Sequence, residues 1–178
     1  MAPSSLGCAL NVADNLLRMT LIALADANVR FVVCGGVACV LQGVARTTHH
    51  LDVRVALETP DLEALVRVAR ALELRPRVPE PIESLLDAER RRAWVEEKHA
   101  VVYTLVAASG AFALDVFLSY PLSFDELAAE ADSFEVEGRR FLVSSKRHLI
   151  VAKSSVTPPR KVDLRDIEDL QELLSVPP

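Results

Sequence analysis

The segment that most restricts the fold lies between residues 31 and 52 and reads FVVCGGVACVLQGVARTTHHLD. It begins with a short apolar run rich in β-branched side chains, which predicts a buried strand. The glycine pair Gly35-Gly36 stops this run, and residues 37–43 predict a short helix that ends at Gly43. A second strand begins at about residue 50. This order predicts an α+β fold in which a short mixed β-sheet is flanked by helices.

The second strand carries a polar face. Residues 50–57 read HLDVRVAL, so apolar side chains alternate with His50, Asp52 and Arg54. Successive side chains of a strand point to opposite faces, and these three therefore share one face. His49 points to the other face from His50, so one metal ion would rarely take both histidines.

The rest of the chain alternates helical and strand patterns without an internal repeat or a domain linker. Apolar side chains at helical spacing, with a capping box at Ser123 and Glu126, predict helices. Apolar runs around Ser109-Gly110 and Glu137-Gly138 predict two antiparallel hairpins. Residues 75–82 hold three prolines and predict a loop or an extended connector. We expect helices over residues 11–28, 59–72, 84–97, 123–131, 145–156 and 162–174, and strands over 99–107, 111–119 and within 133–145.

Length and composition favour a single domain over residues 1–178, with a core over about residues 12–174 and a C-terminal helical segment over 145–174. The chain has 178 residues, of which 51% are hydrophobic and 25% charged, an ordinary composition for a globular protein. The net charge of −5 gives no overall basic surface for nucleic acid. Three cysteines without CxxC spacing argue against a disulfide framework. Since no signal peptide or membrane-spanning pattern is found, we expect a cytoplasmic protein without a membrane partner.

The ordered motifs resemble those of the nucleotidyltransferase fold shared by DNA polymerase β-like enzymes. The likeness is closest to the group that includes the AbiEii-type toxins and the minimal nucleotidyltransferases. That group carries a glycine pair, an Arg-x-Thr-x-Asp-x-Asp strand and a third carboxylate on a later strand. Gly35-Gly36 match the pair, and Asp115 in LDVF matches the third carboxylate. Arg46, Thr48 and Asp52 match three of the four fixed places of the strand motif.

The resemblance continues into the C-terminal helical segment. Residues 148–171 look like the group's Leu-x-x-x-Lys segment followed by Arg-Pro-Lys-Asp-x-x-Asp. The group places a lysine where Lys153 stands, which favours a contact with the triphosphate. For the acidic residues of the last helix, the simpler interpretation is pairing with Lys161 and Arg165. The residues that fall on the motif are Lys153, Arg160, Lys161, Asp163 and Asp166.

The resemblance implies transfer of a nucleoside monophosphate from a nucleoside triphosphate to an acceptor, with release of pyrophosphate. In such chemistry two magnesium ions, about 3.5–4 Å apart, neutralise the charge that builds on the phosphates. Magnesium prefers oxygen ligands. By this resemblance, His50, Asp52 and Asp115 occupy the catalytic and metal-binding positions. The nucleotide would be bound by Gly35, Gly36, Arg46, Thr48 and Lys153, with the glycine backbone close to the phosphates.

The strand motif departs from the group's pattern at position 50, where His50 replaces the first carboxylate. Magnesium takes imidazole poorly. The expected cofactor is therefore Mg²⁺ or Mn²⁺, and a site of His50, Asp52 and Asp115 favours manganese or another transition metal. A general base at His50 is a further alternative, because imidazole titrates near neutral pH.

Two functions follow from these patterns. The first is a metal-dependent nucleotidyltransferase that modifies an RNA or protein acceptor in a toxin–antitoxin or defence setting. Its partners would be a nucleoside triphosphate, the acceptor and an antitoxin or other protein. The second is a catalytically impaired relative that binds a nucleotide, or only a partner protein, as a regulatory or interaction module. The family resemblance favours the first function, and His50 favours the second.

Overall fold

The computed structural model describes residues 12–175. Its strands are β1 (Phe31–Cys34), β2 (His50–Val55), β3 (Arg75–Pro76), β4 (Val102–Val106), β5 (Ala113–Phe117), β6 (Asp132–Val136) and β7 (Arg139–Val143). Its helices are α1 (Val12–Asp26), α2 (Gly35–Leu41), α3 (Thr59–Ala71), the 3-10 helix η1 (Ile82–Leu86), α4 (Ala88–Lys98), α5 (Phe124–Ala129), α6 (Lys146–Ser154) and α7 (Lys161–Ser175).

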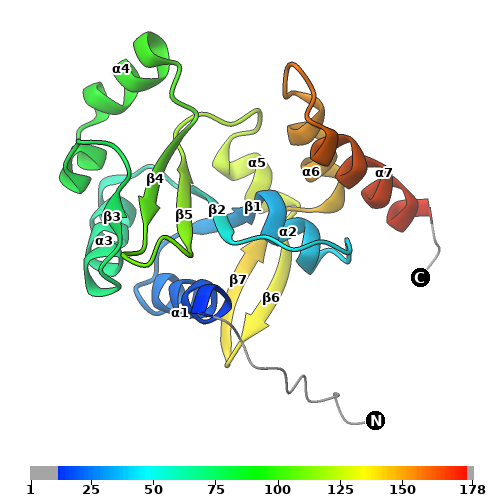
Figure 1. Cartoon of the computed structure of the whole chain (residues 1–178), viewed down its shortest axis with the longest axis horizontal. Coiled ribbons are helices and arrows are strands. Elements are labelled where there is room, and N and C mark those ends of the chain that lie inside the picture. Colours follow the sequence, from blue (N-terminus) through cyan, green and yellow to red (C-terminus); the bar gives the residue numbers. More distant parts are fainter. Residues whose placement is uncertain (1–11, 176–178) are drawn as a thin grey trace.

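One mixed sheet runs through the described part of the chain (Figure 1). The seven strands of residues 12–175 lie in the order β3-β4-β5-β2-β1-β7-β6. β1 pairs in parallel with β7, and β2 pairs in parallel with β5, while the other neighbouring strands are antiparallel. The predicted α+β fold with a mixed sheet flanked by helices is confirmed.

The two faces of the sheet are covered differently. Leu24 of α1 and Leu65 of α3 are fully buried in one large apolar cluster with the strand residues Val33 and Val53. Removing such side chains from water is worth about 25 cal/mol for each Å² of apolar surface, so this face supplies most of the core. On the other face, Val32, Cys34 and Leu127 of α5 form a smaller cluster.

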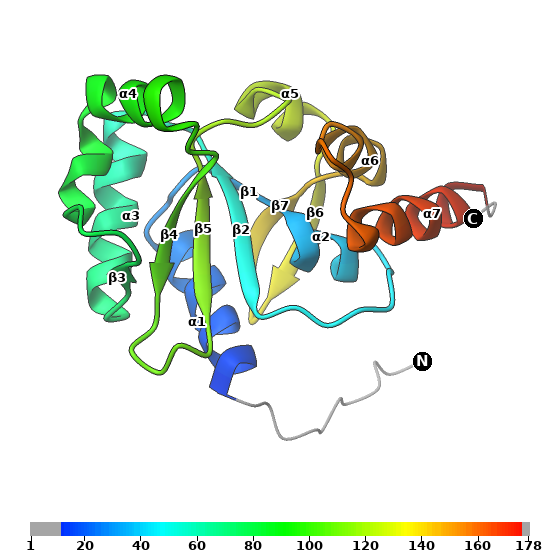
Figure 2. The ribbon, with the colours of Figure 1, turned by 45° about the horizontal axis from the view of Figure 1, so that its top comes forward.

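The face of the smaller cluster holds the polar side chains of β2. Cys34 is the register partner of Asp52 across the β1–β2 pair, and register partners point to the same face. Figure 2 shows α6 and α7 lying next to each other beyond α2, away from α3 and α4. The polar face of β2 is therefore flanked by α5, α6 and the start of α7.

Most of the predicted elements are found with shifted ends. The helix expected from residue 37 begins at Gly35, and the connector over residues 75–82 contains the short β3. The capping box of Ser123 and Glu126 is present. Glu137 and Gly138 both have positive φ, 49° and 78°, as a two-residue hairpin turn requires. The expected helix start at residue 11 lies outside the described residues.

No helix between residues 12 and 175 combines the length and apolar character needed to cross a bilayer.

Candidate active site

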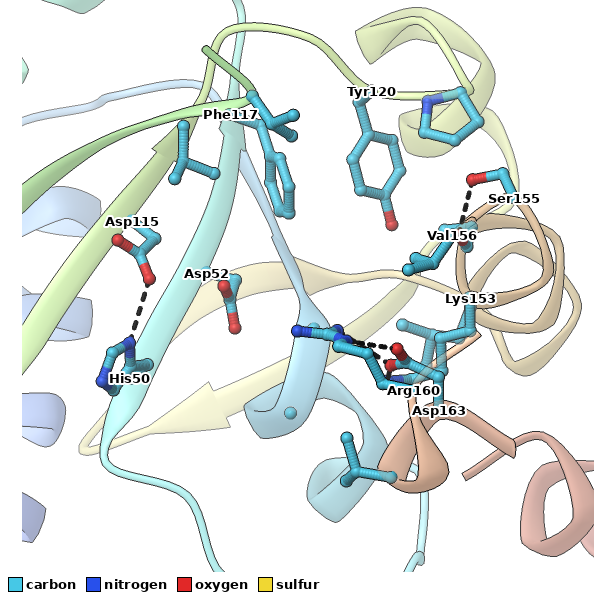
Figure 3. Close-up of a pocket in the computed structure, with 18 of the residues that line it drawn as sticks. His50, Asp52, Asp115, Phe117, Tyr120, Lys153, Ser155, Val156, Arg160 and Asp163 are labelled. Atoms are coloured by element: carbon cyan, nitrogen blue, oxygen red, sulfur yellow. Dashed lines mark hydrogen bonds and ion pairs between the residues drawn. The ribbon is translucent and has the colours of Figure 1, made fainter. Parts of the chain in front are cut away.

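Strands β2 and β5 bring Asp52 and Asp115 side by side. The two residues are register partners in this parallel pair, so both side chains leave the same face of the sheet. Figure 3 shows the two carboxylates directed into one pocket. The two carboxylates that the sequence motif assigns to separate strands therefore lie on adjacent strands.

The glycine turn lies directly against Asp52. Gly35 has a φ of +59°, and a Cβ there would collide with the Asp52 carboxylate. A Cβ on Gly36 would approach Thr48 Oγ1 to 3.0 Å and the Arg46 guanidinium carbon to 3.2 Å. Gly35 is thus required by its positive φ and by the position of Asp52, whereas a side chain at Gly36 would press against Thr48 and Arg46. The predicted turn therefore holds Asp52, Thr48 and Arg46 close to the start of α2.

Asp52 carries a strongly perturbed carboxyl group. Burial, and after it the negative charge of Asp115, raise its pKa to about 6, although the backbone N–H of Gly36 lowers it. Among the described residues, no lysine or arginine forms an ion pair with Asp52 or Asp115. The two neighbouring carboxylates thus lack a compensating positive side chain in contact with them.

His50 lies within hydrogen-bond distance of Asp115. The distance from His50 Nδ1 to Asp115 Oδ2 is 3.0 Å, and the hydroxyl of Thr104 donates to Asp115 Oδ1. The imidazole side chain is 49% exposed, and its Nε2 has no hydrogen-bond partner among the described residues. Asp115 therefore fixes the ring through Nδ1 and leaves Nε2 accessible.

The cations expected to bind the triphosphate are already paired with acidic residues of α7. Lys153 Nζ lies 2.6 Å from Asp166 Oδ2 and 3.2 Å from Asp163 Oδ1. Arg46 pairs with Asp166 as well. The expected pairing of these aspartates with Lys161 and Arg165 is therefore wrong, because both carboxylates turn inward. Asp163, Asp166 and Lys153 are all buried.

Arg160 is the exposed cation of this region. Its Nη2 donates to Asp163 Oδ1 at 3.0 Å, yet its side chain is 66% exposed. Figure 3 shows the guanidinium of Arg160 extending from the start of α7 towards Asp52. Arg160 thus retains donors that a ligand in the pocket could use.

A pocket of about 630 Å³ joins these groups. One part is polar and contains Asp52, Asp115 and Arg160. Another part is apolar, and no sequence motif marks its residues as candidates for the site. The signal for Phe117 was its position two residues after Asp115 on one strand, whereas Tyr120 lies in an irregular loop. The apolar lining includes Val101, Val102, Phe117, Tyr120, Pro121 and Val156.

The fit of the expected metal ions depends on the carboxylates alone. No three His, Cys, Asp or Glu side chains within residues 12–175 are arranged to hold a metal ion, and His50 directs its Nδ1 to Asp115. Asp52 and Asp115 still offer hard oxygen donors whose charge is uncompensated, which fits one divalent cation. The imidazole at position 50 does not fit the ligand set of a magnesium pair.

No protein-family model matches the chain, and no curated protein sequence matches it. Several solved structures share its fold, among them the following two. The first is a lincosamide antibiotic adenylyltransferase, LnuA, with lincomycin bound. It matches with 15% sequence identity and a TM-score of 0.59 over 89% of this chain and 96% of that one. The second is the antibiotic-resistance factor ANT(2'')-Ia, with 18% identity and a TM-score of 0.52 over 90% of this chain and 82% of that one.

Both matches extend over most of this chain. At such low identity they establish the fold and leave the assignment to the AbiEii-like group as a prediction. The chain has a nucleotidyltransferase-like fold.

Proposed function

We propose that this protein is a nucleotidyltransferase that moves a nucleoside monophosphate from a nucleoside triphosphate to an acceptor hydroxyl. The observation that carries the proposal is the register of Asp52 and Asp115 on parallel strands, directly beside the turn at Gly35. Two neighbouring carboxylates without a lysine or arginine partner are costly to keep together unless a ligand compensates them.

Asp52 and Asp115 would hold one divalent cation, Mg²⁺ or Mn²⁺. When bound, the cation neutralises charge on the reacting phosphates. Asp52 is the better donor, because the oxygens of Asp115 already accept from Thr104 and contact His50. Asp115 then serves mainly to orient the imidazole.

His50 would receive the proton of the acceptor. The acceptor oxygen forms a bond to the α-phosphorus, the bond from that phosphorus to the bridging oxygen breaks, and pyrophosphate leaves. The hydroxyl proton moves to His50 Nε2, which is accessible while Nδ1 is held by Asp115. A carboxylate that orients an imidazole in this way is a recurrent arrangement for general-base catalysis.

The opposite side of the pocket would bind the leaving pyrophosphate. Arg160 is the exposed guanidinium there, and guanidinium groups match phosphate oxygens well. Arg46 and Lys153 are paired with Asp166. They would contribute indirectly, because these ion pairs hold the start of α7, next to Arg160, in place. The backbone at Gly35 and Gly36, with Thr48, completes the expected nucleotide-binding set.

The acceptor class is the finer part of the proposal. The resemblance to AbiEii-type toxins favours RNA or protein, with an antitoxin or another protein as partner. LnuA is named as an antibiotic adenylyltransferase, which favours a small hydroxyl compound. The pocket of about 630 Å³ accommodates a nucleotide with a small acceptor. The test therefore includes small-molecule acceptors as well as RNA and protein.

The experiment is an incubation of the protein with each α-labelled ribonucleoside triphosphate and Mg²⁺ or Mn²⁺. Total RNA, total protein and a set of hydroxyl-bearing small molecules serve as acceptors. We expect label in one acceptor fraction and release of pyrophosphate. Asp125→Asn, an exposed change on α5, is the matched control for Asp52→Asn. Absence of label with every acceptor and both cations would refute catalysis.

The second candidate is a nucleotide-binding or interaction module without catalysis. The histidine at position 50 favours it, because the motif's first carboxylate is missing there. A thermal-shift measurement separates the possibilities. A triphosphate at about 100 times its dissociation constant adds roughly 2.7 kcal/mol to the stability, and Gly36→Val should abolish that rise. If no triphosphate shifts the melting temperature with either cation, only an interaction module remains.

A further inference from the structure

The apolar part of the pocket has a defined aromatic wall, formed by Phe117 and Tyr120. Their ring centroids lie 4.6 Å apart with an interplanar angle of 64°. Val101 and Val156 line the pocket next to them, and Val101 is 54% exposed. The chemistry proposed above involves none of these side chains. An exposed apolar surface inside a polar pocket is a sign of a ligand-binding function.

The aromatic wall is built on the sheet. Phe117 ends β5 two residues after Asp115, so the two side chains lie on the same face. Arg54 Nη1 donates to the Phe117 carbonyl oxygen at 2.9 Å, which fixes the end of the strand. Tyr120 packs onto the small cluster that contains Val32. The wall is therefore held at a fixed position relative to the two carboxylates.

The in-line geometry of phosphoryl transfer indicates which part of the substrate lies next to the aromatic wall. In phosphoryl transfer the attacking and leaving oxygens lie roughly in line through the phosphorus. Figure 3 shows His50 and Asp115 on one side of Asp52 and Arg160 on the other. An acceptor at His50 and a pyrophosphate at Arg160 fill this line, so the nucleoside must leave the α-phosphate sideways. Phe117 and Tyr120 border the pocket to the side of that line.

We infer that the Phe117–Tyr120 wall binds the nucleobase of the triphosphate. This inference rests on the proposed nucleotidyl transfer and assigns one part of its substrate to one part of the pocket. Every base presents a flat π-surface to an aromatic side chain, and stacking of this kind discriminates little by hydrogen bonding. We therefore expect purine triphosphates to bind more tightly than pyrimidine triphosphates, with little difference between ATP and GTP.

The test compares nucleoside triphosphates with inorganic tripolyphosphate, which has no base. Dissociation constants are measured by calorimetry on the full chain with Mn²⁺. Phe117→Leu and Tyr120→Leu keep apolar volume and remove the ring. We expect each to weaken ATP binding about 5- to 150-fold, the range that stacking of 1–3 kcal/mol per base gives, and to leave tripolyphosphate binding unchanged. Phe134→Leu, a partly buried aromatic position on β6 outside the pocket, is the matched control.

A second measurement addresses stacking directly. The fluorescence of 2-aminopurine riboside triphosphate should be quenched on binding to the wild-type protein and less quenched with Phe117→Leu. Equal loss of ATP and tripolyphosphate binding, or unchanged ATP binding, would overturn the assignment of the base, the latter pointing to the acceptor as the occupant. If tripolyphosphate binds and the base adds nothing, only this inference fails. If neither ATP nor tripolyphosphate binds, the proposed function fails with it.

Discussion

Two pairs of aspartates lie in the region of the pocket, and the fold surrounds them in opposite ways. Asp52 and Asp115, on β2 and β5, have no arginine or lysine partner in the described chain, and burial raises the pKa of Asp52 to about 6. Asp163 and Asp166, on α7, are almost completely buried. Burial alone would raise the pKa of Asp163, but hydrogen bonds from Arg160 and Lys153 hold it below its usual range.

The difference separates a carboxylate that serves the structure from one that serves a ligand. The α7 pair is compensated inside the chain by Lys153 and Arg46, so it stabilises the attachment of α7 without help from outside. The strand pair remains uncompensated, which costs stability and is maintained where function requires it. Removing a carboxylate should therefore have opposite consequences in the two pairs.

The largest effect should come from Asp52→Asn, measured as nucleotidyl transfer. We expect the rate to fall at least about 10³-fold, equivalent to about 4 kcal/mol of transition-state stabilisation, since the neutral amide is a poor cation ligand. The free energy of unfolding should stay the same or rise, because a buried charge next to Asp115 disappears. Urea denaturation reports the stability, and a clear loss of stability would show that Asp52 is structural.

Asp166→Asn should show the reverse pattern. The change leaves Arg46 without its ion-pair partner and Lys153 with one of its two, at a carboxylate that is itself buried. Breaking one side of a buried ion pair costs about 3 kcal/mol or more, and we expect that loss in urea denaturation. Asp169→Asn, an exposed change on α7, is the control. Stability equal to that of the control would break the comparison.

The sequence could predict the strand pair and not the helix pair, for a physical reason. Strand alternation and chain order place Asp52 and Asp115 on one face as soon as β2 and β5 are neighbours. The ion pair of Arg46 with Asp166 joins residues 120 positions apart. It depends on the angle at which α7 packs, which no local pattern specifies. Local spacing instead favoured Lys161 and Arg165 as the partners of the α7 aspartates, but the side chains of both are exposed.

The role of position 50 shows a second limit of sequence reasoning. The strand motif identified His50 as a substituted ligand position, and its side chain does lie in the pocket with Asp52. The motif gave no sign that the imidazole would bond to Asp115, because that contact depends on the rotamer adopted between two strands. The aromatic wall was missed for a similar reason, since Tyr120 lies in a loop outside any motif.

His50→Asp tests whether the strand pair lacks a third carboxylate. An aspartate adds a carboxylate ligand and can also accept the proton that the proposed reaction assigns to His50. We therefore expect the magnesium-dependent rate to rise about 10- to 100-fold, which corresponds to roughly 1.4–2.7 kcal/mol, and the preference for manganese to decrease. His50→Asn supplies neither a carboxylate nor a titrating ring, is the control, and should be slower than the wild type. A His50→Asp rate below that of the wild type with both cations would show that position 50 requires the imidazole and not a third carboxylate.

The smallest expected effect is the pH dependence that Asp52 gives to stability. Its pKa of about 6 lies above the unfolded value near 4, so between these pH values the folded protein holds a proton that the unfolded chain has lost. The free energy of unfolding should then decrease as the pH rises through this window. Because Asp52 keeps contact with solvent, we expect wild type to lose about 1–2 kcal/mol more than Asp52→Asn between pH 4 and pH 7.

Urea denaturation in EDTA at several pH values measures this difference, since the other carboxyl groups are common to both proteins. The pH dependence that Asp163 gives to the free energy of unfolding has the opposite sign. Its lowered pKa gives stability that is present above pH 4 and lost as the pH falls further. Mn²⁺ added at pH 7 should restore the lost stability in the wild type and not in Asp52→Asn, because the cation then supplies the charge that Lys153 and Arg160 supply to Asp163. Parallel pH profiles of the two proteins would mean that Asp52 is compensated within the fold, and the contrast between the two acidic pairs would disappear.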